Sequence, residues 1–176
     1  SKNNVDWARE ESPGWDVLPQ RYTWAIDVAE VLTNAGVTNV GFEEEALSVR
    51  DFNELTRRSG GAWQLSPLES SVTRLMIIKD EVEIEHLAKA AAITDAALIE
   101  ALARLDEGMT ELQLAGELED AMRRLGSAGP GFGTIVASGP NAARPHHANG
   151  HRKIKPGEPV VIDMGALLEG YTADLT

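Results

Sequence analysis

The sequence predicts an α+β protein that begins with a short α/β layer, and three observations support this prediction. Between residues 22 and 66, patterns typical of helix and of strand alternate twice. Two longer patterns with helical spacing follow, from Asp80 to about Leu125. From Phe132 onward the apolar residues are mostly β-branched and fall in short runs between turn residues, which is typical of an antiparallel sheet.

The α/β layer is predicted from the first part of the chain. Residues 1 to about 19 are largely polar apart from Trp7 and Trp15, and we expect them to be irregular. The elements expected after them are helices over 22–34 and 48–58 and strands over 37–43 and 62–66. Ser48 is a suitable N-cap for the second helix. Because no strand precedes the first helix, we expect only the end of an α/β layer.

Two capping boxes predict where the long helices begin. Asp80 with Glu83 starts the first, and Thr110 with Gln113 starts the second. We expect these helices to span 80–105 and 110–125. Their apolar positions predict the faces that are buried. These are Ile84, Leu87, Ala88, Ala91, Ala92, Leu98, Leu102 and Leu105 in the first helix, and Leu114, Ala115, Leu118, Met122 and Leu125 in the second.

The chain ends in a predicted β-hairpin that contains two aspartates. The runs GTIVASG, PVVIDMG and GYTADLT predict three strands after a glycine-rich loop at 126–133. A two-residue turn on Leu168–Glu169 places Asp163 directly opposite Asp174. A turn on Glu169–Gly170 makes the two aspartates diagonal neighbours instead. Both turns keep the carboxylates on one face, because side-chain direction alternates along a strand.

Two negative charges this close on an apolar hairpin repel each other, and a dry environment strengthens the repulsion. One carboxyl group could keep a proton, a basic side chain could lie between the two, or a divalent cation could bind both. No Lys or Arg lies between Asp163 and Asp174 in the sequence, and their apolar neighbours predict a strand buried on both faces. The residues alone leave two interpretations open: a metal site, or aspartates that face solvent or cap turns.

The composition excludes several classes of function. The formal net charge of −12 argues against a nucleic-acid partner. The absence of cysteine excludes disulfides, thiolate nucleophiles and Cys-bound zinc, and it is compatible with the cytoplasm, where we place the protein. No apolar run reaches the roughly 20 residues of a membrane-spanning helix. The first residues show no signal-peptide pattern, so we expect no membrane partner.

Three motifs, in order, resemble the pita-bread metallopeptidases of the Xaa-Pro dipeptidase (prolidase) and aminopeptidase P type. IDMGALLEGYTADLT resembles their first metal-ligand segment, with its pattern Asp-x-Gly … Gly-Tyr-x-x-Asp-x-Thr. TIVASGPNAARPHH resembles their strand and loop with a Pro-His pair, and RLMIIKDEVEIEHLAKAAAITDAAL resembles the helix that opens their catalytic domain. Residues 1–70 resemble the C-terminal part of the creatinase/prolidase-like N-terminal domain. The resemblance implies that residues 71–176 are the N-terminal half of the pita-bread domain.

The resemblance also implies roles for individual residues. Asp163 would bind one divalent ion, and Asp174 would bridge two. His146 matches a catalytic His that contacts the substrate or helps to move protons. His147 occupies a position that is often small in the family, so either imidazole could be the functional one. We interpret the remaining candidates as solvated or structural: His147 and His151 in the loop, His86 in its helix, and Gly165 and Tyr171 as packing residues.

The implied cofactors are two divalent metal ions. Carboxylate and imidazole ligands suit Mn²⁺, Co²⁺ or Zn²⁺, and a carboxylate-rich set favours Mn²⁺. The implied reaction is hydrolysis of the Xaa-Pro bond, in dipeptides or at peptide N-termini, by a hydroxide held between the two metals. The substrate would be a proline-containing peptide. Family members are commonly homodimers, and we expect the same here by analogy.

The family needs five metal ligands, and the resemblance places the other three, a His and two Glu, beyond Thr176. We therefore expect the 176-residue chain alone to be inactive and to require a complementing C-terminal segment. Two alternatives use the same fold. A creatinase-like hydrolase works without the metals, and its relatives depart from the paired Asp. A catalytically inactive binding module would lack the remaining His or Glu ligands.

Overall fold

The computed structural model describes residues 4–176, which divide into two compact units. The first unit ends at Ile78, and the second is Lys79–Thr176. The first unit alternates helix and strand, and the second places two helices before a set of short strands. This order confirms the predicted α+β class with an α/β layer at its start.

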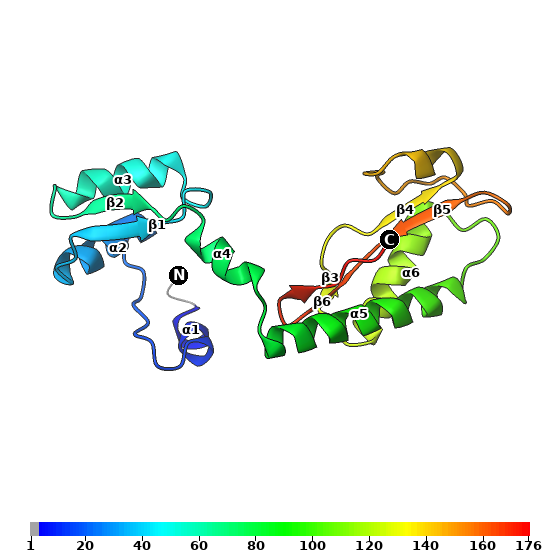
Figure 1. The fold of residues 1–176 in the computed structure, drawn as a ribbon, viewed down its shortest axis with the longest axis horizontal. Helices are drawn as coiled ribbons and strands as arrows, with labels where there is room; N and C mark the ends of the chain where they lie inside the picture. Colours follow the sequence, from blue (N-terminus) through cyan, green and yellow to red (C-terminus); the bar gives the residue numbers. More distant parts are fainter. Residues whose placement is uncertain (1–3) are drawn as a thin grey trace. The chain divides into compact units, whose positions relative to one another are not determined.

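The first unit contains a two-stranded parallel sheet, and its helices α2 and α3 pack against each other beside that sheet (Figure 1). Its elements are α1 (Val5–Glu11), α2 (Trp24–Asn34), β1 (Asn39–Phe42), α3 (Val49–Ser59), β2 (Gln64–Pro67) and α4 (Ser71–Ile77). The buried cluster of this unit is made by Ala25, Ala29, Leu55 and Trp63. The predicted N-cap is confirmed, because the Ser48 side chain accepts a hydrogen bond from the Asp51 backbone amide at 3.1 Å.

Two helices of the first unit were not expected. α1 lies where we predicted an irregular segment; residues 1–3 of that segment lie outside the described part of the chain. Trp7 and Trp15 are exposed, and no residue of α1 or α4 is buried. Neither helix therefore has the buried apolar stripe from which a helix is predicted. α1 has a local ion pair instead, between Arg9 and Asp6 at 3.2 Å.

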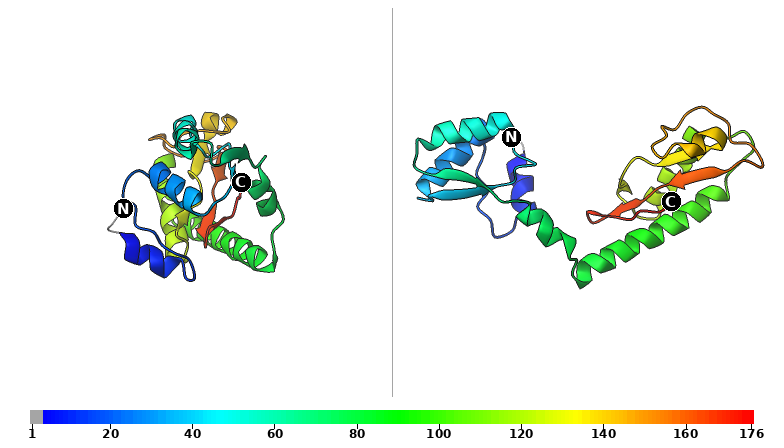
Figure 2. Two further views of the ribbon diagram at one scale, coloured as in Figure 1. Left: turned by 90° about the vertical axis from the view of Figure 1, so that its left-hand side faces the viewer. Right: turned by 45° about the horizontal axis from the view of Figure 1, so that its top comes forward.

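The second unit packs two helices against short antiparallel strands. Its elements are α5 (Glu81–Leu102), α6 (Glu111–Arg124), β3 (Gly129–Pro130), β4 (Ile135–Ser138), the 3₁₀ helix η2 (Gly139–Ala143), β5 (Val160–Asp163), β6 (Ala166–Leu168) and β7 (Tyr171–Thr172). β4 pairs with β5, and β6 lies between β3 and β7. α5 lies alongside β6 and β7, and α6 lies beside β4 (Figures 1 and 2).

Both predicted capping boxes are present in the second unit. Asp80 accepts a hydrogen bond from the Glu83 amide at 2.9 Å, and Glu83 accepts one from the Asp80 amide at 2.7 Å. Thr110 and Gln113 make the same reciprocal pair at 3.2 and 2.9 Å. The helix starts are therefore as predicted, whereas α5 ends at Leu102, three residues earlier than expected.

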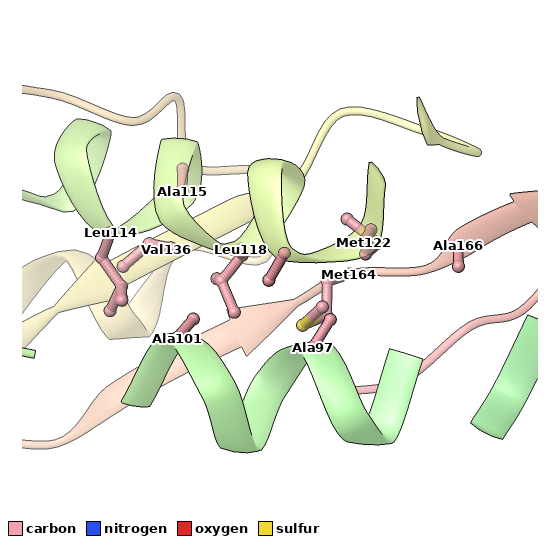
Figure 3. Close-up of a cluster of buried hydrophobic side chains, with 10 residues drawn as sticks. Ala97, Ala101, Leu114, Ala115, Leu118, Met122, Val136, Met164 and Ala166 are labelled. Carbon is pink, nitrogen blue, oxygen red and sulfur yellow. The ribbon is translucent and has the colours of Figure 1, made fainter. Parts of the chain in front are cut away.

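The core of the second unit lies where α5, α6 and the strands meet (Figure 3). Its buried members are Ala97, Ala101, Leu114, Ala115, Leu118, Ala121, Met122, Val136, Met164 and Ala166. The predicted face of α6 is confirmed except at Leu125, which is 40% exposed because it caps the end of the helix.

The predicted buried face of α5 is wrong at most positions, although Leu98 packs against the core. The residues that are buried are Ala90, Thr94, Ala97 and Ala101, whereas Ile84 and Leu102 are exposed. α5 carries apolar residues on more than one side, so spacing alone does not select the face that packs. Figure 3 shows the small side chains Ala97 and Ala101 facing Leu118 and Met164, an arrangement that lets the helix approach closely. No helix within residues 4–176 is both long and apolar enough to cross a membrane.

Candidate metal centre and its histidine loop

The hairpin that contains the two aspartates turns at Glu169–Gly170. The cross-strand pairs are Leu168↔Tyr171, Leu167↔Thr172 and, further along, Met164↔Leu175. Both turn residues have positive φ, 49° and 84°, as a two-residue type I′ turn requires. Of the two predicted turns, the second is the one that forms. Asp163 and Asp174 are therefore diagonal neighbours.

The two carboxylates lie on the strand face that points away from the helical core. Ile162 and Met164, which flank Asp163, pack into that core. Because side chains alternate along a strand, Asp163 points the other way, and the hairpin register places Asp174 on the same side as Asp163. Diagonal neighbours of this kind lie roughly 7–8 Å apart. The like charges therefore share one face, as predicted for both turns.

No basic side chain within residues 4–176 neutralises these carboxylates. Neither aspartate forms an ion pair there, and the Asp163 Oδ1 atom is buried without a hydrogen-bond partner. A buried carboxylate oxygen without a partner is costly, and a cation is a partner that would satisfy it. Oxygen donors of this kind fit a divalent metal ion.

The two aspartates supply only part of a coordination shell. Among residues 4–176 there is no group of three or more His, Cys, Asp or Glu side chains that could hold a metal ion. The strand is also less enclosed than predicted: Val161 is 36% exposed, so one face of β5 is open within the described residues. The site therefore needs further donors, and its open face leaves room for them.

Tight packing holds the hairpin together beside Asp163. A Cβ atom added to Gly165 would overlap the carbonyl oxygen of Ala173 and press on the ring of Phe132. Only glycine allows the two strands to approach this closely. Gly165 is thus a packing residue, as the sequence indicated.

Tyr171 and His86 join the hairpin to the start of α5. The Tyr171 hydroxyl donates a hydrogen bond to Glu83 at 3.0 Å, and this bond raises the Tyr171 pKa. The His86 ring stacks on Tyr171 with centroids 5.5 Å apart and an interplanar angle of 7°. Both contacts are structural, in agreement with the interpretation from the sequence.

The histidines of the loop after η2 differ sharply in environment. His146 is exposed, and within residues 4–176 its ring makes no hydrogen bond or ion pair. His147 is only 11% exposed at its side chain, and its Nε2 atom lies 2.8 Å from Glu111 Oε2. The interpretation of His147 as a solvated residue is therefore wrong, because a buried carboxylate holds its ring. His151 is exposed, as expected.

Glu111 is a buried charged residue that the sequence analysis missed. Its carboxylate is fully buried at the first residue of α6. Acidic residues are common at this position because they interact favourably with the helix dipole, so the sequence does not distinguish Glu111 as a buried charge. It accepts hydrogen bonds from the amide and hydroxyl of Ser138, both at 2.8 Å, and from the Asn141 side chain at 2.9 Å. Burial raises the Glu111 pKa, but these bonds and the one to His147 outweigh it and lower the pKa to about 2.

A second ion pair supports the same strand end. Arg152 donates to Ser138 Oγ at 2.6 Å and to both oxygens of Glu158, at 2.5 and 2.6 Å. The hydrogen bond from Arg152 is the main reason that the pKa of Glu158 is lowered to about 2. Ser138 therefore links a carboxylate on one side to a guanidinium on the other.

Comparison with known proteins identifies the family. Residues 85–176 match metallopeptidase family M24, and the chain belongs to this family. Over 172 residues it is 30% identical to an uncharacterised peptidase of Bacillus subtilis, covering 98% of this chain and 48% of that protein. Over 141 residues it is 33% identical to a Xaa-Pro dipeptidase of Pyrococcus horikoshii, covering 80% of this chain and 40% of that protein.

Solved structures show the same fold. The X-Pro aminopeptidase of Thermotoga maritima matches with a TM-score of 0.88 and 29% identity, over 98% of this chain and 49% of that one. The prolidase of Pyrococcus furiosus matches with a TM-score of 0.85 and 30% identity, over 98% and 52%. The chain thus spans about half the length of its relatives, and over that half it has the pita-bread architecture that its motifs resemble. The predicted family and fold class are confirmed.

Proposed function

We propose that this chain is part of a dinuclear metal-dependent Xaa-Pro peptidase and supplies two of its metal ligands, Asp163 and Asp174. The observation that carries the proposal is the hairpin: two carboxylates share one face, and within residues 4–176 no basic side chain pairs with them and Asp163 Oδ1 is buried without a partner. The Xaa-Pro dipeptidase and X-Pro aminopeptidase among the relatives support the substrate class.

In this proposal, residues 1–70 are the end of a creatinase/prolidase-like N-terminal domain, and residues 71–176 are the first half of the catalytic domain. The remaining ligands, a His and two Glu, would come from a segment outside this chain. Mn²⁺ is the metal that a carboxylate-rich set favours. By analogy with the family, the assembled enzyme would be a homodimer.

Each site residue has a separate task in the reaction. Asp163 would hold one ion, and Asp174 would hold both. Such ions, when bound, acidify a water molecule and polarise the scissile carbonyl group. His146 would orient the peptide or stabilise the transition state by hydrogen bonding, and its exposed ring, which has no partner within residues 4–176, supports this role.

Calorimetry tests the metal site. Titration of the intact protein with Mn²⁺ should show binding, and Asp174→Ala should abolish most of it. Asp120→Ala is the matched control, since it removes the same charge from an exposed side chain on α6. Equal binding by the Asp174→Ala and control proteins would remove the metal hypothesis.

Activity distinguishes the alternatives. The metal-loaded intact protein should hydrolyse an Xaa-Pro dipeptide faster than the matching Xaa-Ala dipeptide, and a chelator should stop it. Hydrolysis of creatine without metal would indicate the creatinase-like alternative instead. Metal-independent peptide binding without turnover would indicate a binding module.

A further inference from the structure

The carboxylate of Glu111 links α6 by hydrogen bonds to three residues of the segment 138–147, which contains His146. It projects from the first residue of α6 and is fully buried. Its partners are Ser138 at the end of β4, Asn141 in η2 and His147 in the following loop. Three consecutive parts of one segment are thus fixed to a helix that belongs to the core.

A second set of hydrogen bonds, made by Asn149, holds the C-terminal end of the same loop. The Asn149 side chain accepts a hydrogen bond from the Val136 amide at 2.7 Å and donates one to the Thr134 carbonyl at 2.6 Å. In the sequence, His146 therefore lies between Asn141, which precedes it, and His147 and Asn149, which follow it. The side chains of these three residues are all held by hydrogen bonds. Its backbone is held while its own ring is exposed, an arrangement suited to a group that must meet a ligand.

We propose that Glu111 is a positioning residue that holds the His146 ring in place for the peptide substrate, acting through Asn141 and His147. This inference rests on the proposed function of His146. Glu111 itself is fully buried, so it acts through its hydrogen-bond partners. A displacement of about 1 Å at a reacting group can cost on the order of a hundredfold in rate, so a tie of this kind affects turnover.

Amide hydrogen exchange tests the tie without any need for activity. Glu111→Gln removes the negative charge, and His147→Ala removes a single tie and disturbs the core less. Both should speed exchange at residues 144–149 by roughly tenfold or more. Glu119→Gln is the matched control, because its side chain lies on the same helix and forms an ion pair with Arg123 at 3.7 Å, away from the loop. Exchange in the loop that matches the control in both variants would overturn the proposal.

A double-mutant cycle tests whether Glu111 acts through His146. In the intact, metal-loaded protein, Glu111→Gln should lower kcat/KM for an Xaa-Pro dipeptide by about tenfold to a hundredfold. In a His146→Ala background the same change should cost little more, because its target is gone. His147→Gln, which keeps a donor, should restore most of the activity lost in His147→Ala. Equal losses in both backgrounds would overturn the proposal.

The exchange experiment and the double-mutant cycle together distinguish failure of this inference from failure of the proposed function. If the parent protein hydrolyses no Xaa-Pro peptide, the proposed function fails and the positioning role fails with it, whereas the exchange arm still decides whether Glu111 ties the loop. If the parent is active and the cycle is additive, the proposed function stands and only the positioning role is lost.

Discussion

At the scale of single residues, the second unit depends on polar groups whose partners are distant in sequence. Glu111 is the clearest case, because its partners lie 27 to 36 residues away. A buried carboxylate is stabilising only while all of its hydrogen bonds are made. Its contribution to stability must therefore depend on pH.

The pKa of Glu111 predicts the direction of that dependence. The pKa is about 2 in the folded chain against an ordinary value of 4.5, so the stabilisation is complete above about pH 5 and is lost as the pH falls toward 2. The difference corresponds to about 3 kcal/mol. Denaturant unfolding from pH 7 to 2 should show a steeper loss in the parent than in Glu111→Gln. Parallel curves for these two proteins would contradict this prediction.

Alanine substitutions at Gly165 and at Gly116 should change the free energy of unfolding in opposite directions. Gly165→Ala should destabilise the second unit by about 1–3 kcal/mol, because the new methyl group meets the Ala173 carbonyl. Gly116→Ala, on α6, meets nothing within 4 Å and should stabilise by up to about 1 kcal/mol through helix propensity. Thermal unfolding of both variants checks the pair. Similar shifts in the two melting temperatures would count against the close strand approach.

At the scale of elements, capping decides where the helices begin, and packing decides how they are oriented. The capping box at Asp80 satisfies backbone groups of α5 that have no partner inside the helix. The same helix buries small residues toward α6 and leaves larger apolar ones exposed. Its start is thus a local property, whereas its buried face is not.

Loss of the α5 cap should be measurable. Asp80→Ala should lower the free energy of unfolding of the second unit by about 1 kcal/mol, because the Glu83 amide loses its acceptor. Asp95→Ala, at an exposed position within the helix, is the control and should cost nothing or slightly stabilise. Urea unfolding followed by helical circular dichroism measures both. A control as destabilised as the variant would contradict a capping role.

At the scale of the whole molecule, each unit has a hydrophobic cluster of its own. All four tryptophans of the chain lie in the first unit, and Trp63 is in its cluster. The cluster of the second unit contains no tryptophan and centres on the helix α6, with Leu118 fully buried. Tryptophan fluorescence therefore reports on the first unit alone.

Because each unit has its own hydrophobic cluster, a core mutation in the second unit should destabilise that unit and leave the stability of the first unchanged. Leu118→Ala should destabilise the second unit by about 2–5 kcal/mol through the cavity that it leaves. Amide exchange in α5 and α6 should accelerate, while the unfolding midpoint seen by tryptophan fluorescence stays unchanged. An equal shift of the fluorescence midpoint would show that the two units unfold together.

Part of the candidate site could be predicted from local sequence, and part could not. Alternation along the strands puts Asp163 and Asp174 on one face for either turn, so their shared side follows from spacing alone. Which turn forms, and hence whether the pair is direct or diagonal, depends on the backbone at Glu169 and Gly170. The burial of His147 depends on a carboxylate from another element, which no local pattern reveals.

The starts of α3, α5 and α6 and the shared face of the two aspartates follow from the sequence alone, because caps and strand alternation act over a few neighbouring residues. Only the tertiary structure decided which side of α5 is buried, that His147 is held rather than solvated, and that Glu111 holds it. Those outcomes come from contacts between segments far apart in the chain, where burial removes water as the alternative hydrogen-bond partner.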